Sequence, residues 1–243
     1  MPRGLQKRPC ECTFARQDVS ASAVTKKTNA MKSTCKTPMG ELEIHTLGHA
    51  SLLLRLGRET IYTDPYSQVC DFTTQPKASL VLITHDHYDH LDPEALRPIL
   101  TPSTTVIANP DAASHLAGAI SLRNGEMTSW KGIAIKALPA YNTTGRNPSG
   151  EFFHPRGVGN GYLMDFDGFR VYVAGDTEFI PEMSACRGVD VAFLPKNLPY
   201  TMSDEMFVEA ARFISPKVLY PYLYFEVDID SLRRALPGIE VRL

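Results

Sequence analysis

Histidine and aspartate side chains are concentrated in one short segment, His85-Asp86-His87-Tyr88-Asp89-His90. It contains three of the seven histidines of the chain, which a merely solvated, charged loop does not explain. Imidazole and carboxylate groups together suit Zn, Mn or Fe as ligands. Placed on a loop, they leave coordination positions open for water. The segment therefore predicts a metal site.

A buried strand is expected to precede residues 85–90 and to position them. Residues 79–84 form a short apolar run (Ser-Leu-Val-Leu-Ile-Thr), which is typical of a strand buried on both faces. On the other side, Asp92 and Pro93 are typical of a helix start, because aspartate can cap the first turn and proline fits within it. The metal segment thus lies in a strand-to-helix turn that can direct several side chains toward one point.

The rest of the chain divides into two strand-rich halves. Polar–apolar alternation and short apolar runs predict strands, and apolar residues at helical spacing predict helices. The predicted strands cover residues 41–45, 51–55, 60–63, 104–108, 132–138, 161–165, 169–173, 189–194, 217–220 and 240–243, and further helices cover 110–117, 203–213 and 230–236. We expect an α/β protein in which two sheets pack face to face with helices outside, as one domain over residues 38–243.

Residues 1–37 have a different composition. They hold eight Lys and Arg residues against two acidic ones, with many Ser, Thr and Ala. Low hydrophobicity and a basic bias predict a disordered extension. A flexible tail, a stretch ahead of a true start at Met31 or Met39, and an organellar presequence all fit this composition.

The overall composition limits the classes of partner that the protein is expected to bind. A formal net charge of -2 over 243 residues argues against a nucleic-acid backbone or an anionic membrane as the main partner, and favours a small-molecule substrate. No apolar run reaches the roughly 18–20 residues that a membrane span needs. The five cysteines form no CxxC pair, and scattered cysteines suit a reducing cytosol. The predicted location is therefore cytoplasmic.

The H-x-H-x-D-H pattern of residues 85–90 resembles the metallo-β-lactamase superfamily, whose fold is a four-layer αβ/βα sandwich. Leu47-Gly48-His49-Ala50-Ser51 and Thr63-Asp64-Pro65 resemble the branch that includes ascorbate-phosphate lactonase and related small hydrolases. Ala174-Gly175-Asp176-Thr177 is similar to the motif that carries the bridging aspartate of the superfamily. The resemblance extends over residues 40–243.

The resemblance implies a ligand set. His85 and His87 would bind a first metal, Asp89 and His90 a second, and Asp176 would bridge the two. A third histidine for the first metal is expected between the metal segment and Asp176. His154 is favoured, because its Phe-His-Pro setting and the preceding Ala-Tyr-Asn resemble one subgroup, although a structural loop role stays open; a surface role is favoured for His115.

One position departs from the family pattern. The last ligand of the superfamily is a histidine near the C-terminus, and Leu223 stands at the matching place. No histidine follows His154 in the chain. We therefore expect one tightly bound Zn or Mn and a doubtful second site.

Further side chains are candidates for contacts around the metal. His49 is expected to touch substrate or a metal ligand, with a buried structural role or a substitute ligand as alternatives. Asp64 resembles the aspartate that braces the metal loops of the family. The remaining candidates for substrate contacts lie in loops near His154 or after a predicted buried strand, and they are Tyr141, Asn142, Arg156 and Asn197.

The chemistry implied is hydrolysis of a small lactone, ester or phosphoester by a metal-bound hydroxide. Asp89 would orient the water and transfer its proton, as the catalytic residue. Two alternatives are a metal-binding protein with an impaired second site and little catalysis, and a nuclease or phosphodiesterase on the same fold. The net charge counts against the nuclease.

Overall fold

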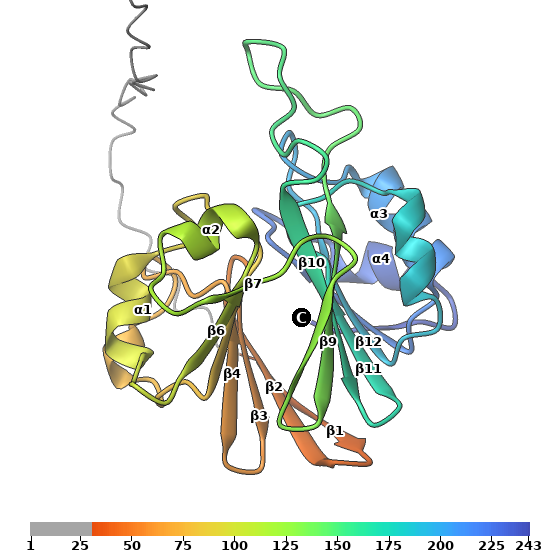
Figure 1. The fold of residues 1–243 in the computed structure, drawn as a ribbon. Helices are drawn as coiled ribbons and strands as arrows, with labels where there is room; N and C mark the ends of the chain where they lie inside the picture. Colours follow the sequence, from red (N-terminus) through yellow and green to blue (C-terminus); the bar gives the residue numbers. More distant parts are fainter. Residues whose placement is uncertain (1–30) are drawn as a thin grey trace, which may run out of the picture.

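The computed structural model describes residues 31–243, which fold into two facing sheets with helices on their outer sides (Figure 1). Helices α1 (Pro93–Ile99) and α2 (Pro110–Ser114) cover the first sheet, and α3 (Asp204–Ile214) and α4 (Ile229–Ala235) cover the second. This is the α/β four-layer αβ/βα sandwich that the sequence predicted. No helix in the described range is long and apolar enough to cross a membrane.

In the first sheet the strands lie side by side in sequence order. The pairs up to β4 are antiparallel, and those from β4 onward are parallel. The strands are β1 (Met31–Thr37), β2 (Gly40–Gly48), β3 (Ser51–Leu56), β4 (Glu59–Thr63), β5 (Leu80–Ile83), β6 (Thr105–Ala108) and β7 (Ile120–Ser121). Consequently β2, β4 and β5 run in the same direction and end at one edge.

The second sheet repeats this plan. Its antiparallel pairs are followed by parallel ones from β11 onward. The strands are β8 (Met127–Trp130), β9 (Ile133–Ala140), β10 (Gly159–Phe166), β11 (Phe169–Val173), β12 (Val191–Pro195), β13 (Val218–Tyr222) and β14 (Glu240–Val241). Here β9, β11, β12 and β13 end at a common edge.

Two hydrogen bonds join these edges. The backbone N–H of Asn160 donates to the carbonyl of Thr84 at 2.9 Å, and the Tyr162 hydroxyl donates to the carbonyl of Ile83 at 2.7 Å. Because Thr84 follows β5 and Asn160 lies at the start of β10, the carboxyl ends of both sets of strands meet. Loops that leave these ends converge on one place, which is where α/β proteins usually bind ligands.

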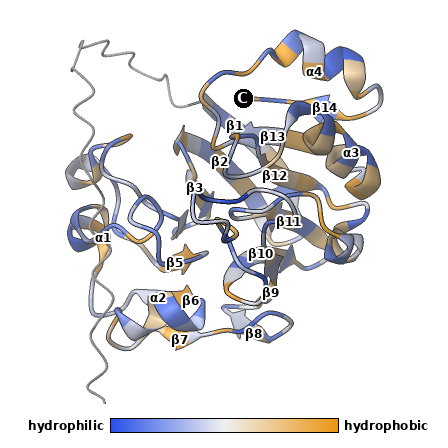
Figure 2. Ribbon diagram, turned by 90° about the horizontal axis from the view of Figure 1, so that it is seen from above, coloured by the Kyte–Doolittle hydropathy of each residue, from blue (hydrophilic) through white to orange (hydrophobic). Residues whose placement is uncertain are grey.

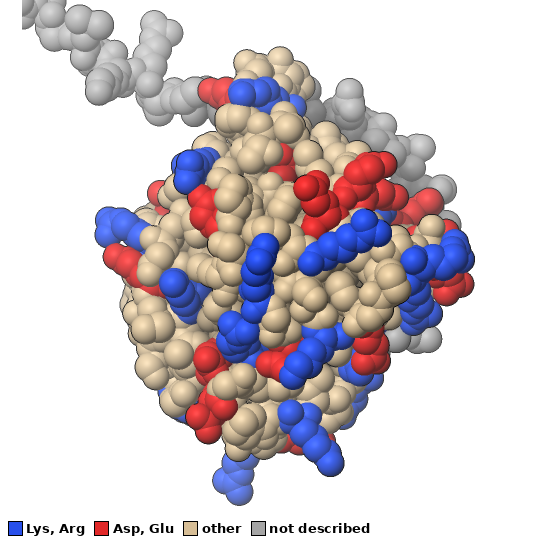
Figure 3. Space-filling model, turned by 90° about the vertical axis from the view of Figure 1, so that its right-hand side faces the viewer, with Lys and Arg blue, Asp and Glu red and all other residues tan. Residues whose placement is uncertain are grey.

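Hydrophobic residues fill the space between the sheets and under the helices. In the view from above, hydrophobic residues lie along the strands of both sheets (Figure 2). The central cluster includes Leu54 and Phe193, the layer under α3 includes Phe207, and the layer under α1 includes Leu96. On the face in Figure 3, basic and acidic side chains are interspersed over the surface.

The first strand corrects the predicted domain boundary. Residues 31–37 were expected in a disordered extension, and that expectation is wrong, because β1 pairs antiparallel with β2 over seven residues. Its partly buried positions are small or polar, Ser33, Cys35 and Thr37, and therefore give little hydrophobic signal. Cys35 packs against the central core, and Ser33 hydrogen bonds with Tyr220 of the second sheet. The rest of the predicted extension, residues 1–30, lies outside the described part.

Local capping explains where the helices begin. Asp92 accepts a hydrogen bond from the N–H of Glu94 and caps α1, as the sequence predicted, and Ser203 caps α3 through the N–H of Met206. Short 3-10 turns occupy Phe72–Thr74 and Pro181–Cys186. The metal segment therefore lies between a buried strand and a capped helix.

Candidate metal centre

Asp64 holds the base of the metal segment. Its carboxylate is fully buried at the end of β4 and accepts three hydrogen bonds. Oδ1 accepts the N–H of Thr84 at 2.8 Å, while Oδ2 accepts the Thr84 hydroxyl at 2.7 Å and Nδ1–H of His90 at 2.8 Å. This is the bracing contact that the family resemblance implies for Asp64.

These contacts fix the tautomers of two imidazoles. The single proton of the Thr84 hydroxyl is given to Asp64, so the oxygen accepts Nδ1–H of His85 at 3.0 Å. His90 likewise gives its Nδ1–H to Asp64. The Nε2 atoms of His85 and His90 are left without a hydrogen-bond partner, and their rings lie 4.1 Å apart. A hydrogen bond on the other ring nitrogen is characteristic of metal-ligating histidines.

His154 is held in the same manner by Asn142. Asn142 Oδ1 accepts both the backbone N–H and Nδ1–H of His154, each at 2.8 Å. The orientation of the amide follows from its other end, since Nδ2 donates to the Tyr200 carbonyl at 2.8 Å. His154 Nε2 is thereby directed to Asp176 Oδ2, 3.3 Å away. The exposed ring of His87 lies 5.0 Å from that of His154.

Asp176 lies between the histidines. The chain turns sharply at Gly175, whose φ is +69°, and a Cβ there would stand 2.5 Å from the Asn160 carbonyl oxygen. Only glycine permits this close approach. Asp176 Oδ1 lies 3.3 Å from His90 Nε2, so one carboxylate reaches both His90 and His154.

Two overlapping donor sets result from this arrangement. The ligand atoms of His85, His87 and His154 lie within 4.8 Å of one another, as do those of His85, His90 and Asp176. A third set of the same compactness comprises His49, Asp89 and His90. The structure therefore brings together all six residues expected as ligands.

The chemistry of this donor set fits a divalent metal. His85 Nε2, His90 Nε2 and Asp176 Oδ1 are buried and make no hydrogen bond. A buried polar atom without a partner is costly, at about 1–3 kcal/mol, and three of them converge here. Burial also lowers the pKa values of His85 and His154, which keeps these imidazoles neutral as ligands must be. Burial lowers the pKa of His90 too, but Asp176 and Asp64 outweigh it and raise the pKa well above its usual value. The carboxylates thus favour a cation at this point.

Glu178 anchors the loop that carries Asn142 and His154, and it was not among the residues predicted for the site. Its buried carboxylate accepts the N–H groups of Thr143, Thr144 and Gly145 at 2.6–2.7 Å, and both threonine hydroxyls as well. Burial raises the pKa of Glu178, but these donors outweigh it and lower the pKa to about 2. Its place two residues after Asp176, in a chain turn, was the signal available.

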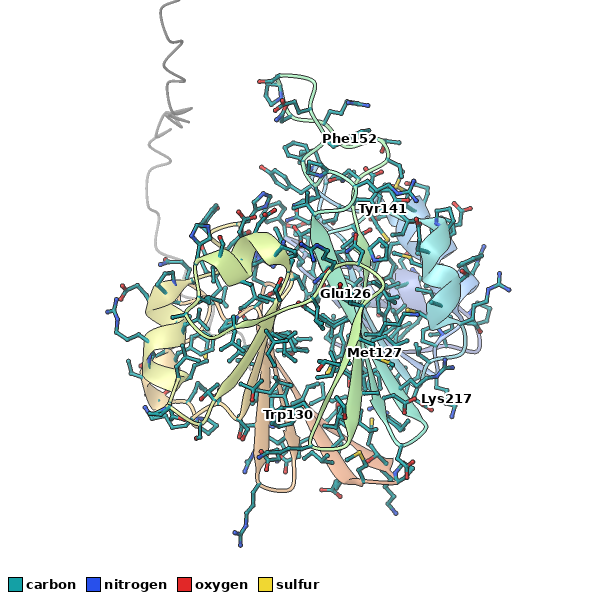
Figure 4. The ribbon with its side chains drawn as sticks, viewed as in Figure 1. Glu126, Met127, Trp130, Tyr141, Phe152 and Lys217 are labelled. Atoms are coloured by element: carbon teal, nitrogen blue, oxygen red, sulfur yellow. The ribbon has the colours of Figure 1, made fainter. Side chains whose placement is uncertain are left out.

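Other predicted residues are directed elsewhere. Tyr141 donates its hydroxyl to Glu182 at 3.0 Å, and Arg156 pairs with the same carboxylate at 2.7 Å. Tyr141 also packs in the layer under α3, at the base of the projecting loop that carries Phe152 (Figure 4). The polar groups of Tyr141 and Arg156 are thus paired with Glu182, and their substrate contacts stay predictions. Asn197 is buried in the loop after β12, and its backbone N–H donates to Thr201 at 2.8 Å.

Comparisons with known proteins agree with this geometry. Residues 43–222 match the family model described as a beta-lactamase superfamily domain. A UPF0173 metal-dependent hydrolase of Thermus thermophilus is 30% identical over 192 residues, covering 75% of this chain and 84% of that protein.

Solved structures give the same relationship. A protein described as a metal-dependent hydrolase from Parabacteroides distasonis is 45% identical, with a TM-score of 0.82 over 88% of this chain and 97% of that one. A metallo hydrolase from Ignicoccus hospitalis shares the fold at 23% identity, with a TM-score of 0.69 over 83% of this chain and 94% of that one. The chain therefore belongs to the metallo-β-lactamase superfamily, as one of its metal-dependent hydrolases.

Proposed function

We propose that this enzyme hydrolyses a carboxylic ester or lactone that carries an apolar group, with Zn or Mn as its metal. The observation that supports this is the convergence of unpaired imidazole and carboxylate groups beside a rim of exposed apolar side chains. His85, His87, His154 and Asp176 would hold the first metal. A bound divalent metal lowers the pKa of a water to about 7 and polarises a carbonyl oxygen.

Asp89 is the proposed catalytic acid–base group. Its carboxylate is partly exposed, and Oδ2 contacts His49 Nε2 at 2.9 Å. From this place at the mouth of the site it can accept a proton from the attacking water and pass it to the departing alkoxide. Asp176 is buried between His90 and His154 and would serve only as a ligand.

The apolar rim favours a substrate with an apolar group. Among the described residues, seven large hydrophobic side chains are exposed, and five of them lie in the loops after β5, β12 and β13: Tyr88, Leu198, Tyr200, Tyr224 and Phe225. Tyr66 packs on Tyr88 at 6.2 Å, and Phe153 on Tyr200 at 4.8 Å. These loops leave the strand ends that form the metal centre. Such exposed apolar surface is a feature of ligand and partner sites.

The basic side chains of the loops around the site do not favour a phosphoester as the substrate. In the loops after β5, β9, β12 and β13, the cations are Arg146, Arg156 and Lys196. Arg156 pairs with Glu182 at 2.7 Å, and Lys196 with Asp204 at 2.6 Å. Arg146 donates to the carbonyl of Gly150 and stacks on Phe152. A phosphate would have to displace one of these partners.

A substrate panel tests the proposal. The protein would be stripped with a chelator, loaded with Zn or Mn, and assayed on p-nitrophenyl acetate, p-nitrophenyl octanoate, short-chain and long-chain lactones, and bis-p-nitrophenyl phosphate. Since each buried methylene contributes about 0.8 kcal/mol, we expect kcat/KM for the octanoate to exceed that for the acetate at least ~10-fold. The phosphodiester should be the poorest substrate.

Matched variants connect turnover to the metal. His85→Ala should remove bound metal and turnover together, whereas His45→Ala, on β2 and paired with Glu43, should retain both. Fastest turnover of the phosphodiester would contradict the proposed substrate class. Full metal loading with no turnover on any ester or lactone would favour the metal-binding protein without catalysis.

We also propose a cytoplasmic location. Cys35, Cys70 and Cys186 carry free thiols, which suits a reducing compartment. Fractionation of cells with an antibody against the native protein tests this, and recovery in an oxidising compartment would contradict it.

A further inference from the structure

We infer that His49 supplies the imidazole of a second metal site, in the role that Leu223 cannot fill. The site comprises His49 Nε2, Asp89 Oδ2, His90 Nε2 and Asp176 Oδ1. This inference rests on the metal centre of the proposed function and extends it from one metal to two. The sequence favoured a doubtful second site because no histidine follows His154, but the fold brings an earlier histidine to the same place.

The distances are those of donors around one ion. His49 Nε2 lies 2.9 Å from Asp89 Oδ2, and His90 Nε2 lies 3.9 Å from the same oxygen. His90 Nε2 lies 3.3 Å from Asp176 Oδ1. Two ligand atoms that are each about 2.1 Å from an ion stand about 3.0–3.4 Å apart, between octahedral and tetrahedral angles. The ligand atoms of His49, Asp89 and His90 all lie within 4.8 Å of one another, and Asp176 adjoins this set through His90.

Two members of the set are buried without a partner. His90 Nε2 and Asp176 Oδ1 form no hydrogen bond, and the side chain of His90 is fully buried. The Nδ1 atom of His90 is committed to Asp64, which leaves Nε2 as the only nitrogen that can act as a ligand. His90 Nε2 lies 3.9 Å from Asp89 Oδ2, and the ring of His49 lies 5.8 Å from that of His90.

His49 lies close enough to Leu223 to take the role of the histidine that the family pattern places at that position. The backbone N–H of Leu223 donates to the His49 carbonyl at 3.0 Å, so the two residues are adjacent although they are far apart in the sequence. Leu223 itself is buried in the central core. The histidine expected at the end of β13 is thus replaced by one from the β2–β3 turn, which lies against the same point of the backbone.

The backbone of His49 supports a role beyond that of a turn. Its φ is +51°, in the left-handed region that side chains with a Cβ rarely adopt, and it follows a glycine at φ +116°. A strained conformation at a non-glycine residue persists where the surroundings require it, often at functional sites. Here it accompanies the contact between the imidazole and Asp89.

The competing role for His49 is that of a hydrogen-bond partner that positions Asp89. A pair of substitutions separates the two. Glutamine at this position keeps an amide N–H that can reach Asp89 but removes the imidazole lone pair, whereas alanine removes both. A ligand is lost in His49→Gln and in His49→Ala alike, while a positioning contact is lost only in His49→Ala.

The experiment measures metal binding without reference to turnover. Full-length wild type, His49→Ala, His49→Gln and the control His45→Ala would be freed of metal, and Zn and Mn binding determined by equilibrium dialysis with elemental analysis. We expect two tight equivalents in wild type and in His45→Ala. In both His49 variants we expect one, with the second bound at least tenfold more weakly. Titration with Co should show the absorption of the second equivalent changed in these variants only. Thermal melting of the metal-free proteins checks that all four are folded.

The outcomes are distinguishable. Two tight equivalents in His49→Ala, or in His49→Gln but not in His49→Ala, would overturn the assignment of His49 as a ligand. A wild type with one tight equivalent would overturn the second site while leaving the first site of the proposed function intact. A wild type that binds no metal would overturn the proposed function itself.

Discussion

Oδ1 of Asn142 lies 2.8 Å from both the backbone nitrogen and Nδ1 of His154, and thereby fixes the position and the tautomer of that imidazole with one atom. The other end of the amide donates to the Tyr200 carbonyl and to Glu178. The metal centre therefore depends on a residue that cannot itself be expected to bind the metal, because its oxygen is fully used.

The first prediction concerns this residue. Asn142→Ala should leave His154 without its acceptor and weaken metal binding about 10–100-fold, the usual effect of losing a partner behind a ligand. Asn147→Ala is the control, since Asn147 caps a turn in the same loop through the N–H groups of Ser149 and Glu151. Equal metal affinity in the two variants, measured by competition with a chromophoric chelator, would refute the role of Asn142.

Glu178 provides the second prediction. In Glu178→Gln one of the two oxygens becomes an NH₂ group that faces N–H donors from Thr143 and Thr144 or from Gly145. The substitution removes a buried acceptor and places the new NH₂ donor against N–H donors of the loop. We therefore expect the metal-free protein to lose about 2–4 kcal/mol of unfolding free energy. That corresponds to a fall in Tm of roughly 4–16 °C for a domain of this size.

The control for Glu178 is the nearby Glu182, which is partly exposed where it pairs with Arg156. Glu182→Gln should change Tm by no more than about 1–2 °C, because exposed ion pairs contribute little. If both variants melt alike, the anchoring of the loop by Glu178 is not important for stability.

The sequence predicted those parts of the centre that follow one another along the chain. The spacing within residues 85–90 and the Gly-Asp turn at 175–176 are local patterns, and the structure brings these side chains together. The contact between His49 and Asp89 joins residues 40 positions apart, which come close only because β2, β3, β4 and β5 pair in that order. The sequence therefore indicated His49 as a candidate for contact with a metal ligand, or as a substitute ligand, but did not identify Asp89 as its partner.

The fold was predicted where hydrophobic patterns were strong. β5 and β12 are apolar throughout, and both were recognised. The edge strands β1 and β8 were not recognised: the inward residues of β1 are small or polar, and the four-residue β8 has Trp130 as its single buried residue. Glu178 was missed for a different reason: its six donors come from a loop whose shape no sequence pattern specifies.

The first strand gives the third prediction. A variant beginning at Met31 should keep its Tm, because the composition of residues 1–30 offers little to a core. A variant beginning at Met39 loses the whole β1–β2 ladder and the contact of Ser33 with Tyr220. At about 0.5–1.5 kcal/mol per hydrogen bond we expect a loss of several kcal/mol and a Tm lower by roughly 10 °C. Equal melting of the two variants would show that β1 contributes nothing to stability.

The last prediction concerns Leu223, where the family pattern and the structure lead to opposite expectations. If the second site lacked a ligand, Leu223→His would supply it and raise the number of tightly bound metals from one to two. If His49 already completes the site, the new imidazole has no vacancy to fill. It would also replace an apolar side chain of the central core, and burying a polar group there without a partner costs about 1–3 kcal/mol. We therefore expect Leu223→His to bind two equivalents, as the wild type does, and to melt several degrees lower. Leu223→Met, which keeps the site apolar, should match the wild type in both properties. A rise from one equivalent to two in Leu223→His alone would show that the second site lacks an imidazole, and would refute the role of His49.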